Sequence, residues 1–124
     1  MSTIFTWTTL EHITHKYDLP SRQVIIHIPQ ARRNDLASLL YELDFKSGVE
    51  IGIQRGIFSE IICQRNPQMR VYGVDAWAPP NGASMRQKAQ KRMRVYPQYS
   101  IIDGWSVTAA KQFTDHSLDF VYID

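Results

Sequence analysis

A shortage of cysteine and of long apolar runs narrows the classes of protein to which this sequence can belong. Cys63 is the only cysteine among 124 residues, so the chain can form neither an internal disulfide nor a cysteine metal cluster. The longest apolar runs, 24–28 and 120–123, are far shorter than the roughly 20 residues of a membrane-spanning helix. The N-terminus lacks the basic start and apolar core of a secretory signal. We therefore expect a cytoplasmic protein with no membrane partner.

An excess of charge of one sign is also missing. Fourteen Lys and Arg residues against twelve Asp and Glu residues give a formal net charge of +2, which requires no polyanion, and we expect no nucleic-acid partner. Basic residues do gather between 86 and 94, but apolar residues at helical spacing lie among them, which favours a solvated helix face. Hydrophobic residues make up 44% and charged residues 21%, the balance of one globular domain with a packed core.

What the sequence does contain is an alternation of apolar runs with helical patterns. Strands are predicted at 24–28, 49–52, 70–75, 99–102 and 117–124. Helices are predicted over 8–17, from Asn34 or Asp35 to Asp44, over 58–65, 84–95 and 106–113, with Asn34 and Ser84 as N-caps. The run at 117–124 is almost continuously apolar, which is typical of a strand buried on both faces. This alternation predicts an α/β fold with a parallel sheet and right-handed crossovers.

The loops after the predicted strands are the places to look for a ligand site, because open parallel sheets bind ligands beyond the carboxyl ends of their strands. The segment 50–56, with the sequence EIGIQRG, has glycines at which the backbone can turn sharply and a ligand can approach closely. Exposed N–H groups at the start of the following helix suit an anion. Asp75 ends the neighbouring strand, where a carboxylate can accept both hydroxyls of a ribose. The sequence therefore predicts a nucleoside ligand.

The spacing of the glycines argues against two common nucleotides. A dinucleotide fingerprint has the form G-x-G-x-x-G, but this loop has Gln54 at the second glycine position, which disfavours NAD. A phosphate-binding P-loop ends in Gly-Lys-Ser/Thr, whereas Gly56 is followed by Ile57 and Phe58, which disfavours ATP and GTP.

Four segments in order resemble class I S-adenosylmethionine (SAM)-dependent methyltransferases, particularly the small O-methyltransferase-like group. They are 49–59 (VEIGIQRGIFS), 73–77 (GVDAW), 103–106 (DGWS) and 117–124 (SLDFVYID). The resemblance covers about residues 34–124 and implies a Rossmann-like parallel sheet with flanking helices, containing the first four core strands in the order 3-2-1-4. It further implies that 34–124 is the SAM-binding half of a methyltransferase domain, truncated at strand four. Residues 1–33 are then an N-terminal segment that contains a helix and has no assigned function.

The resemblance also implies roles for the loop residues. Gly52 and Gly56 would contact the methionine part of SAM, and Glu50 would support their loop. Ser59 is a candidate for binding the methionine carboxylate. Asp75 would hold the ribose hydroxyls.

The resemblance places the adenine pocket and the transfer centre further along the chain. The adenine pocket would be lined by Ala76, Trp77, Gly104, Trp105 and Ser106. The two tryptophans have an alternative role as core or acceptor-pocket aromatics. Asp124 would face the methyl-transfer centre as a catalytic residue, and it matches the acid that ligates a divalent cation in metal-dependent members.

The implied activity is methyl transfer from SAM to a small-molecule acceptor, with oxygen preferred to nitrogen as the nucleophile. A chain that ends at the fourth strand is expected to be inactive by itself, and its exposed sheet edge to pair with another chain. Two alternatives stay open: an enzyme of the Rossmann type that uses NAD or another nucleotide, and a non-catalytic fragment or interaction module. Ligand binding separates the three.

Overall fold

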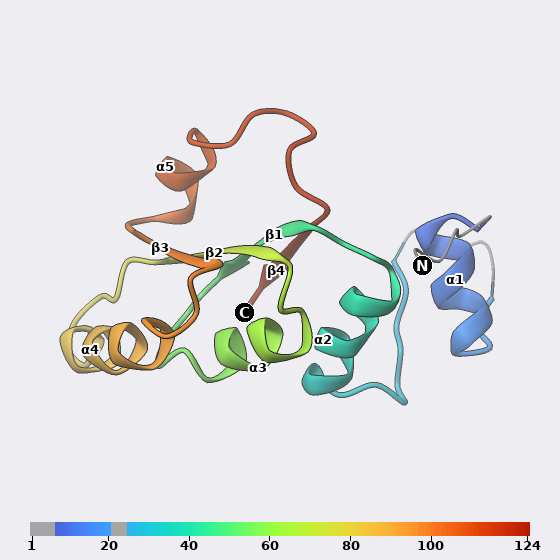
Figure 1. Ribbon diagram of the computed structural model, residues 1–124, viewed down its shortest axis with the longest axis horizontal. Coiled ribbons are helices and arrows are strands. Elements are labelled where there is room, and N and C mark those ends of the chain that lie inside the picture. The colour runs from blue at the N-terminus through green and yellow to red at the C-terminus, as the bar shows by residue number, and fades with distance from the viewer. Residues whose placement is uncertain (1–6, 21–24) are drawn as a thin grey trace.

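The computed structural model describes residues 7–20 and 25–124, which form a parallel sheet with helices on both faces (Figure 1). The strands within these residues are β1 (Ser47–Ile51), β2 (Arg70–Asp75), β3 (Tyr99–Asp103) and β4 (Phe120–Ile123). The helices within the same residues are α1 (Thr9–Lys16), α2 (Arg33–Glu42), α3 (Ile57–Arg65), α4 (Gly82–Met93) and α5 (Ser106–Ala110). The strand order β3-β2-β1-β4, with parallel pairing throughout, confirms the predicted α/β class and the 3-2-1-4 order.

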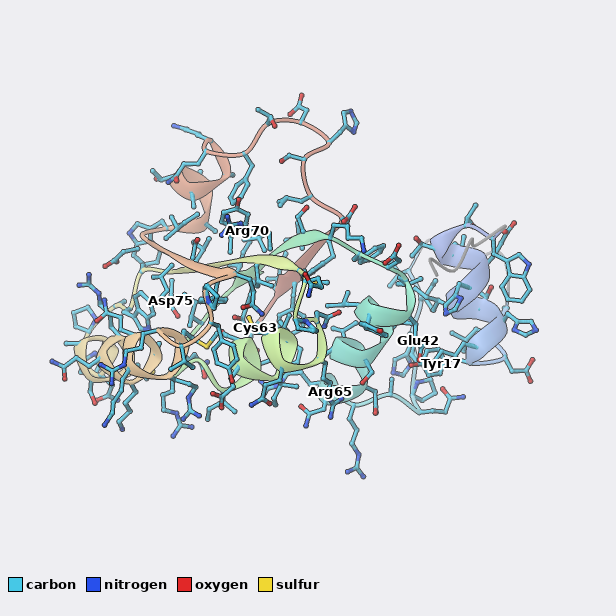
Figure 2. All side chains as sticks on the ribbon, in the orientation of Figure 1. Tyr17, Glu42, Cys63, Arg65, Arg70 and Asp75 are labelled. Carbon is cyan, nitrogen blue, oxygen red and sulfur yellow. The ribbon has the colours of Figure 1, made fainter. Side chains whose placement is uncertain are left out.

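Two layers of side chains cover the sheet. On one face, α2, α3 and α4 lie against the strands, with Ile62 and Cys63 of α3 and Val71 of β2 each at most 1% exposed (Figure 1). Figure 2 labels Cys63 in this layer, and burial raises the pKa of its thiol to about 12, which fits the expected core position. The other face is covered by α5, whose Ala109 packs with Val49 and Val74.

Helix α2 is fastened to α3 by polar contacts as well as by packing. The buried Asn66 side chain donates to the carbonyl oxygens of Ala37 at 2.9 Å and Ile62 at 3.0 Å. Arg65, labelled in Figure 2, donates to the Ser38 hydroxyl at 2.9 Å. These bonds hold the middle of α2 against the C-terminal end of α3.

The predicted strand at 24–28 is wrong for the residues that can be checked. Residues 25–28 form no strand, and Val24 lies outside the described residues. Ile25 is 86% exposed, so its β-branched side chain has no sheet surface to pack on. Strand propensity expresses such packing more than an intrinsic backbone preference.

Two predicted helix caps and one burial pattern also differ. Asn34 and Ser84 lie inside helices, because α2 begins at Arg33 and α4 at Gly82. The start of α2 is capped by Asp35, which accepts the Arg32 N–H at 2.7 Å. Strand β4 is not buried on both faces: it is an edge of the described sheet, and Val121 and Ile123 are 53% and 73% exposed.

Within the part of the chain that the structure describes, we find no helix with the length and hydrophobicity of a transmembrane span.

Candidate functional site

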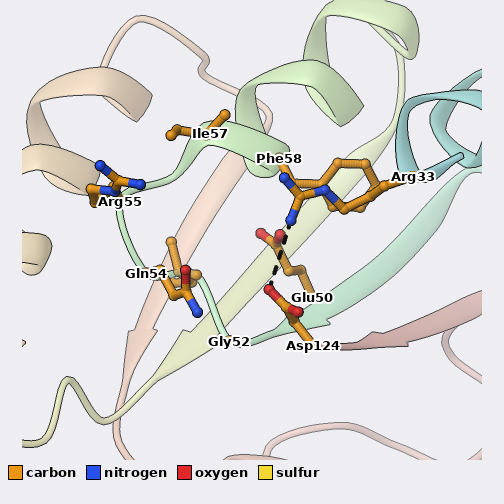
Figure 3. Close-up of a pocket in the computed structure, with 9 residues that line it drawn as sticks. Arg33, Glu50, Gly52, Gln54, Arg55, Ile57, Phe58 and Asp124 are labelled. Atoms are coloured by element: carbon orange, nitrogen blue, oxygen red, sulfur yellow. Dashed lines mark ion pairs between the residues drawn. The ribbon is translucent and has the colours of Figure 1, made fainter.

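Two cavities open at the carboxyl ends of the strands, and Gly52 lines both of them. The larger, which we call the Asp75 cavity, has a volume of about 270 Å³. It brings together seven of the predicted residues: Gly52, Asp75, Ala76, Trp77, Gly104, Trp105 and Ser106. The smaller, the Glu50 cavity, has a volume of about 70 Å³ and includes Glu50, Gly52 and Asp124 (Figure 3).

The glycine loop between β1 and α3 depends on two glycines. Gly52 and Gly56 have φ angles of +98° and +78°, a left-handed region that side chains rarely adopt. A Cβ added at Gly52 would also lie 3.3 Å from the Cβ of Asp124. Gly56 forms the N-cap of α3 and donates its N–H to the Ile53 carbonyl at 2.9 Å. The loop can therefore turn sharply at the cavity, because neither Gly52 nor Gly56 carries a side chain.

The carboxylate of Asp75 joins two loops at the wall of the larger cavity. Its Oδ2 accepts the Gln54 N–H at 2.8 Å, and its Oδ1 accepts the Trp77 N–H at 2.7 Å. A carboxylate oxygen has two lone-pair sites, so each oxygen retains capacity for one more donor. Asp75 thus shapes the site and can still accept two hydroxyls, which is the arrangement that a ribose needs.

The two tryptophans have different environments. Trp77 is 8% exposed, donates its indole N–H to the Gln54 carbonyl at 2.8 Å, and packs with Ile53 and Ala89. Trp105 is 68% exposed beside the Asp75 cavity. A core role therefore describes the Trp77 ring, and Trp105 is the aromatic surface on which a base can stack.

Glu50 and Ser59 form a buried hydrogen-bond network with Tyr99. Ser59 Oγ donates to Glu50 Oε1, and the Tyr99 hydroxyl lies 3.0 Å from Ser59 Oγ and 3.3 Å from Glu50 Oε1. Burial raises the pKa of Glu50 to about 7, against the lowering effect of the two hydroxyls, and burial likewise raises the pKa of Tyr99. Ser59 is 0% exposed and lines neither cavity, so its role in binding the methionine carboxylate stays a prediction.

Asp124 and Arg33 face each other across the Glu50 cavity. The Asp124 N–H donates to the Ile51 carbonyl at 3.0 Å, and its Oδ2 is 3.9 Å from Nη1 of Arg33 (Figure 3). Arg33 and Tyr99 are residues of this site that the motifs did not indicate. Arg33 reaches the cavity only through the packing of α2 on α3, so no local sequence pattern marks it.

Around Asp124 the described residues include no cluster of possible metal ligands. In ranges 7–20 and 25–124, no group of three or more His, Cys, Asp or Glu side chains could hold an ion. Asp124 has the buried Glu50 and the cationic Arg33 as neighbours in the cavity, and a guanidinium beside a carboxylate opposes the entry of a cation. Metal binding at Asp124 stays a prediction, and we assign no step to it.

Comparison with solved structures finds the same fold in O-methyltransferases. O-methyltransferase TomG from Streptomyces achromogenes, solved with SAM, is 20% identical with a TM-score of 0.59, covering 98% of this chain and 55% of that one. An O-methyltransferase from Bacillus cereus, solved with S-adenosylhomocysteine, is 20% identical with a TM-score of 0.59, covering 98% and 56%. A candidate O-methyltransferase from Klebsiella pneumoniae is 17% identical with a TM-score of 0.62, covering 98% and 55%.

These likenesses show a shared fold, and the chain spans about half the length of each of these three structures. No family model matches the sequence. No curated protein matches it either. The Rossmann-like class that the motifs predicted is confirmed, in the version found in O-methyltransferases.

Proposed function

We propose that the two cavities together bind SAM, and that the chain is the cofactor-binding part of a methyltransferase acting on a small-molecule acceptor. The observation that carries this proposal is the Asp75 carboxylate. It is fixed by two backbone N–H groups at the end of β2 and retains acceptor capacity toward a cavity lined by Gly52, Gly104 and Trp105. Two proteins of the same fold, TomG and the Bacillus cereus enzyme, were solved with SAM and S-adenosylhomocysteine.

The shapes of the cavities fit the parts of this cofactor. The Asp75 cavity, at about 270 Å³, approaches the lower limit of small-molecule sites, about 300 Å³, and suits a nucleoside. Ribose hydroxyls would bond to Asp75, and the base would lie beside Trp105, Ala76 and Ser106. Gly52 lines both cavities and has no side chain to separate them. The methionyl part would therefore reach the Glu50 cavity past Gly52 and along the start of α3.

SAM, when bound, supplies a methyl group on a positively charged sulfonium. The contribution of these residues would be to bind and orient it, since alignment of the reacting atoms accounts for much of the acceleration in such transfers. Asp124 lies beside Gly52 at the junction of the cavities, where it would face the transfer centre. We propose an oxygen atom of the acceptor, in preference to nitrogen, as the nucleophile.

A binding experiment tests the proposal against its alternatives. We expect calorimetric titration to show that the chain binds S-adenosylhomocysteine and that NAD does not compete. Gln54 occupies the position of the second glycine in a dinucleotide fingerprint, and its backbone N–H donates to Asp75. We expect its side chain to hinder the close approach of the NAD pyrophosphate. Binding of NAD without S-adenosylhomocysteine would favour the dinucleotide alternative. Binding of neither would favour the non-catalytic one.

A further inference from the structure

Arg33 of α2 brings a positive charge to the Glu50 cavity, which it lines together with Phe58 and Asp124. Its guanidinium carbon lies 5.0 Å from the centre of the Phe58 ring, and its Nη1 is 3.9 Å from Oδ2 of Asp124. That separation is about 1 Å longer than a well-formed charged hydrogen bond. Among the residues that the structure describes, the guanidinium donates no hydrogen bond. Arg33 is thus positioned by stacking and by charge, and its donors remain available.

The helix that carries Arg33 is anchored on α3 by polar contacts. Asn66 and Arg65 of the α3 end bond to Ala37 and Ser38 of α2. Ala37 is 0% exposed in the core layer. These contacts anchor α2 on α3 about one turn after Arg33, and Phe58 at the start of α3 supports the guanidinium itself, as a ligand-binding side chain requires.

The charges around the cavity are arranged for a zwitterion. Figure 3 shows the Arg33 guanidinium on one side and the carboxylates of Glu50 and Asp124 facing it, while Arg55 lies on the opposite side of the loop. A guanidinium that faces the Asp124 carboxylate across the cavity can bind a carboxylate, while Asp124 binds an ammonium group. The volume, about 70 Å³, is roughly twice the 30 Å³ share of one water molecule, which suits a head group of few heavy atoms.

Ser59, the residue that the resemblance suggested for the methionine carboxylate, does not line this cavity. Its hydroxyl is buried and donates to Glu50. The cationic side chains that line the cavity are those of Arg33 and Arg55, and Arg33 is the one that faces Asp124. A guanidinium presents its donors in a planar fork that matches a carboxylate.

The geometry points to Arg33 as the residue that binds the α-carboxylate of the methionyl group, exchanging its loose pairing with Asp124 for direct hydrogen bonds to the ligand. Asp124, released from that pair, then lies next to the ligand's ammonium group. This inference rests on the proposed function, since it assigns one part of SAM within the same site.

The test uses two ligands that differ by the carboxylate alone. Decarboxylated SAM keeps the nucleoside, the sulfonium and the amine. Calorimetry on the 124-residue chain is expected to show that SAM binds about 10- to 100-fold more tightly, the range for hydrogen bonds to a charged group. Arg33→Leu should weaken SAM by this factor and leave decarboxylated SAM unchanged, and Arg33→Lys should retain part of the preference.

Arg32→Leu is the matched control, because it removes the same charge from the neighbouring residue, whose side chain lines neither cavity. It should keep the preference for SAM, and circular dichroism should show that both leucine variants are folded. An unchanged preference in Arg33→Leu would overturn the inference while leaving SAM binding intact. Equal weakening of both ligands would also overturn it, because Arg33 would then only shape the cavity. A wild-type chain that binds neither ligand would contradict the proposed function and this inference together.

Discussion

At the scale of single residues, Asp75 serves two purposes with one carboxylate. It anchors the N–H groups of Gln54 and Trp77, which gives the loops their shape, and it faces the cavity where a ribose would bind. We expect Asp75→Ala to weaken binding of S-adenosylhomocysteine by about 1.5–3 kcal/mol, the range for hydrogen bonds to a charged group. Calorimetry measures this change, and circular dichroism should be unaltered because the two N–H groups that Asp75 anchors lie in loops, outside the helices and strands.

The control for that variant is Asp103→Ala. Asp103 ends the adjacent strand β3, forms an ion pair with Arg86 at 2.7 Å, and lines neither cavity. It should leave the affinity unchanged. Equal losses in the two variants would mean that the ligand responds to the charge of this edge and not to Asp75.

The buried Glu50 should make the stability of the folded chain depend on pH. Burial raises its pKa from 4.5 to about 7, so between these values the folded chain holds a proton that the unfolded chain releases. Stability should therefore fall as pH rises through this window, by about 3 kcal/mol in total. Glu50→Gln resembles the protonated form and keeps an oxygen for the hydroxyls of Ser59 and Tyr99.

Chemical denaturation at a series of pH values from about 4.5 to 8 measures this dependence. Wild type should lose stability relative to Glu50→Gln as the pH rises, whereas Glu60→Gln, altered at a partly exposed acid on α3, should follow wild type. Parallel pH profiles for wild type and Glu50→Gln would contradict this prediction, because they would show that folding does not raise the pKa of Glu50.

Single residues also show which parts of the site sequence patterns can predict and which they cannot. The motifs indicated Gly52, Asp75 and Trp105 because each lies at or just after the end of a strand, and strand ends meet at one edge of a parallel sheet. The position of Ser59 depends on the rotational phase of α3, which turns it into the core. Arg33 depends on the docking of one helix on another, which no local spacing encodes.

At the scale of elements, α2 and α3 act as one unit. Asn66 is 3% exposed, and its amide joins the carbonyls of Ala37 and Ile62. Asn66→Ala should lower the free energy of unfolding by about 1–3 kcal/mol, because a buried carbonyl loses its partner. Asn34→Ala is the control: Asn34 is exposed on α2, and its part in the contact with Arg65 is through its backbone oxygen. Denaturant melts that show equal losses for the two variants would contradict this role.

Elements were predictable where an apolar run had a neighbour to pair with. The strand at 70–75 and the helix beginning near Phe58 lie as expected, because turns and prolines bound them and the sheet buries them. The run at 25–28 has the same residue types but no partner strand among the described residues. Tertiary context, which residue type does not contain, decides between those outcomes.

At the scale of the whole molecule, apolar surface on the α5 face continues to the sheet edge. A groove of about 310 Å³ runs beside α5, lined by Val49, Phe113, Leu118 and Val121 among others. Ile123 extends this surface along β4, where it is 73% exposed. An edge strand with exposed apolar side chains is a template for pairing with another chain, and a contiguous apolar patch adds to the tendency to associate.

We therefore predict that the 124-residue chain self-associates through β4 and the adjoining groove. The double variant Val121→Lys, Ile123→Lys should shift the chain toward monomer, because charged edge residues oppose strand pairing. It leaves unchanged the inward side chains of β4, which pack on β1 and the helices. Analytical ultracentrifugation over a range of concentrations measures the shift. Val95→Lys, at a 68% exposed position after α4, alters an apolar residue away from the edge and should associate as wild type does. Wild type that stays monomeric at every concentration, or association that the double variant leaves unchanged, would show that this edge is not where copies of the chain meet.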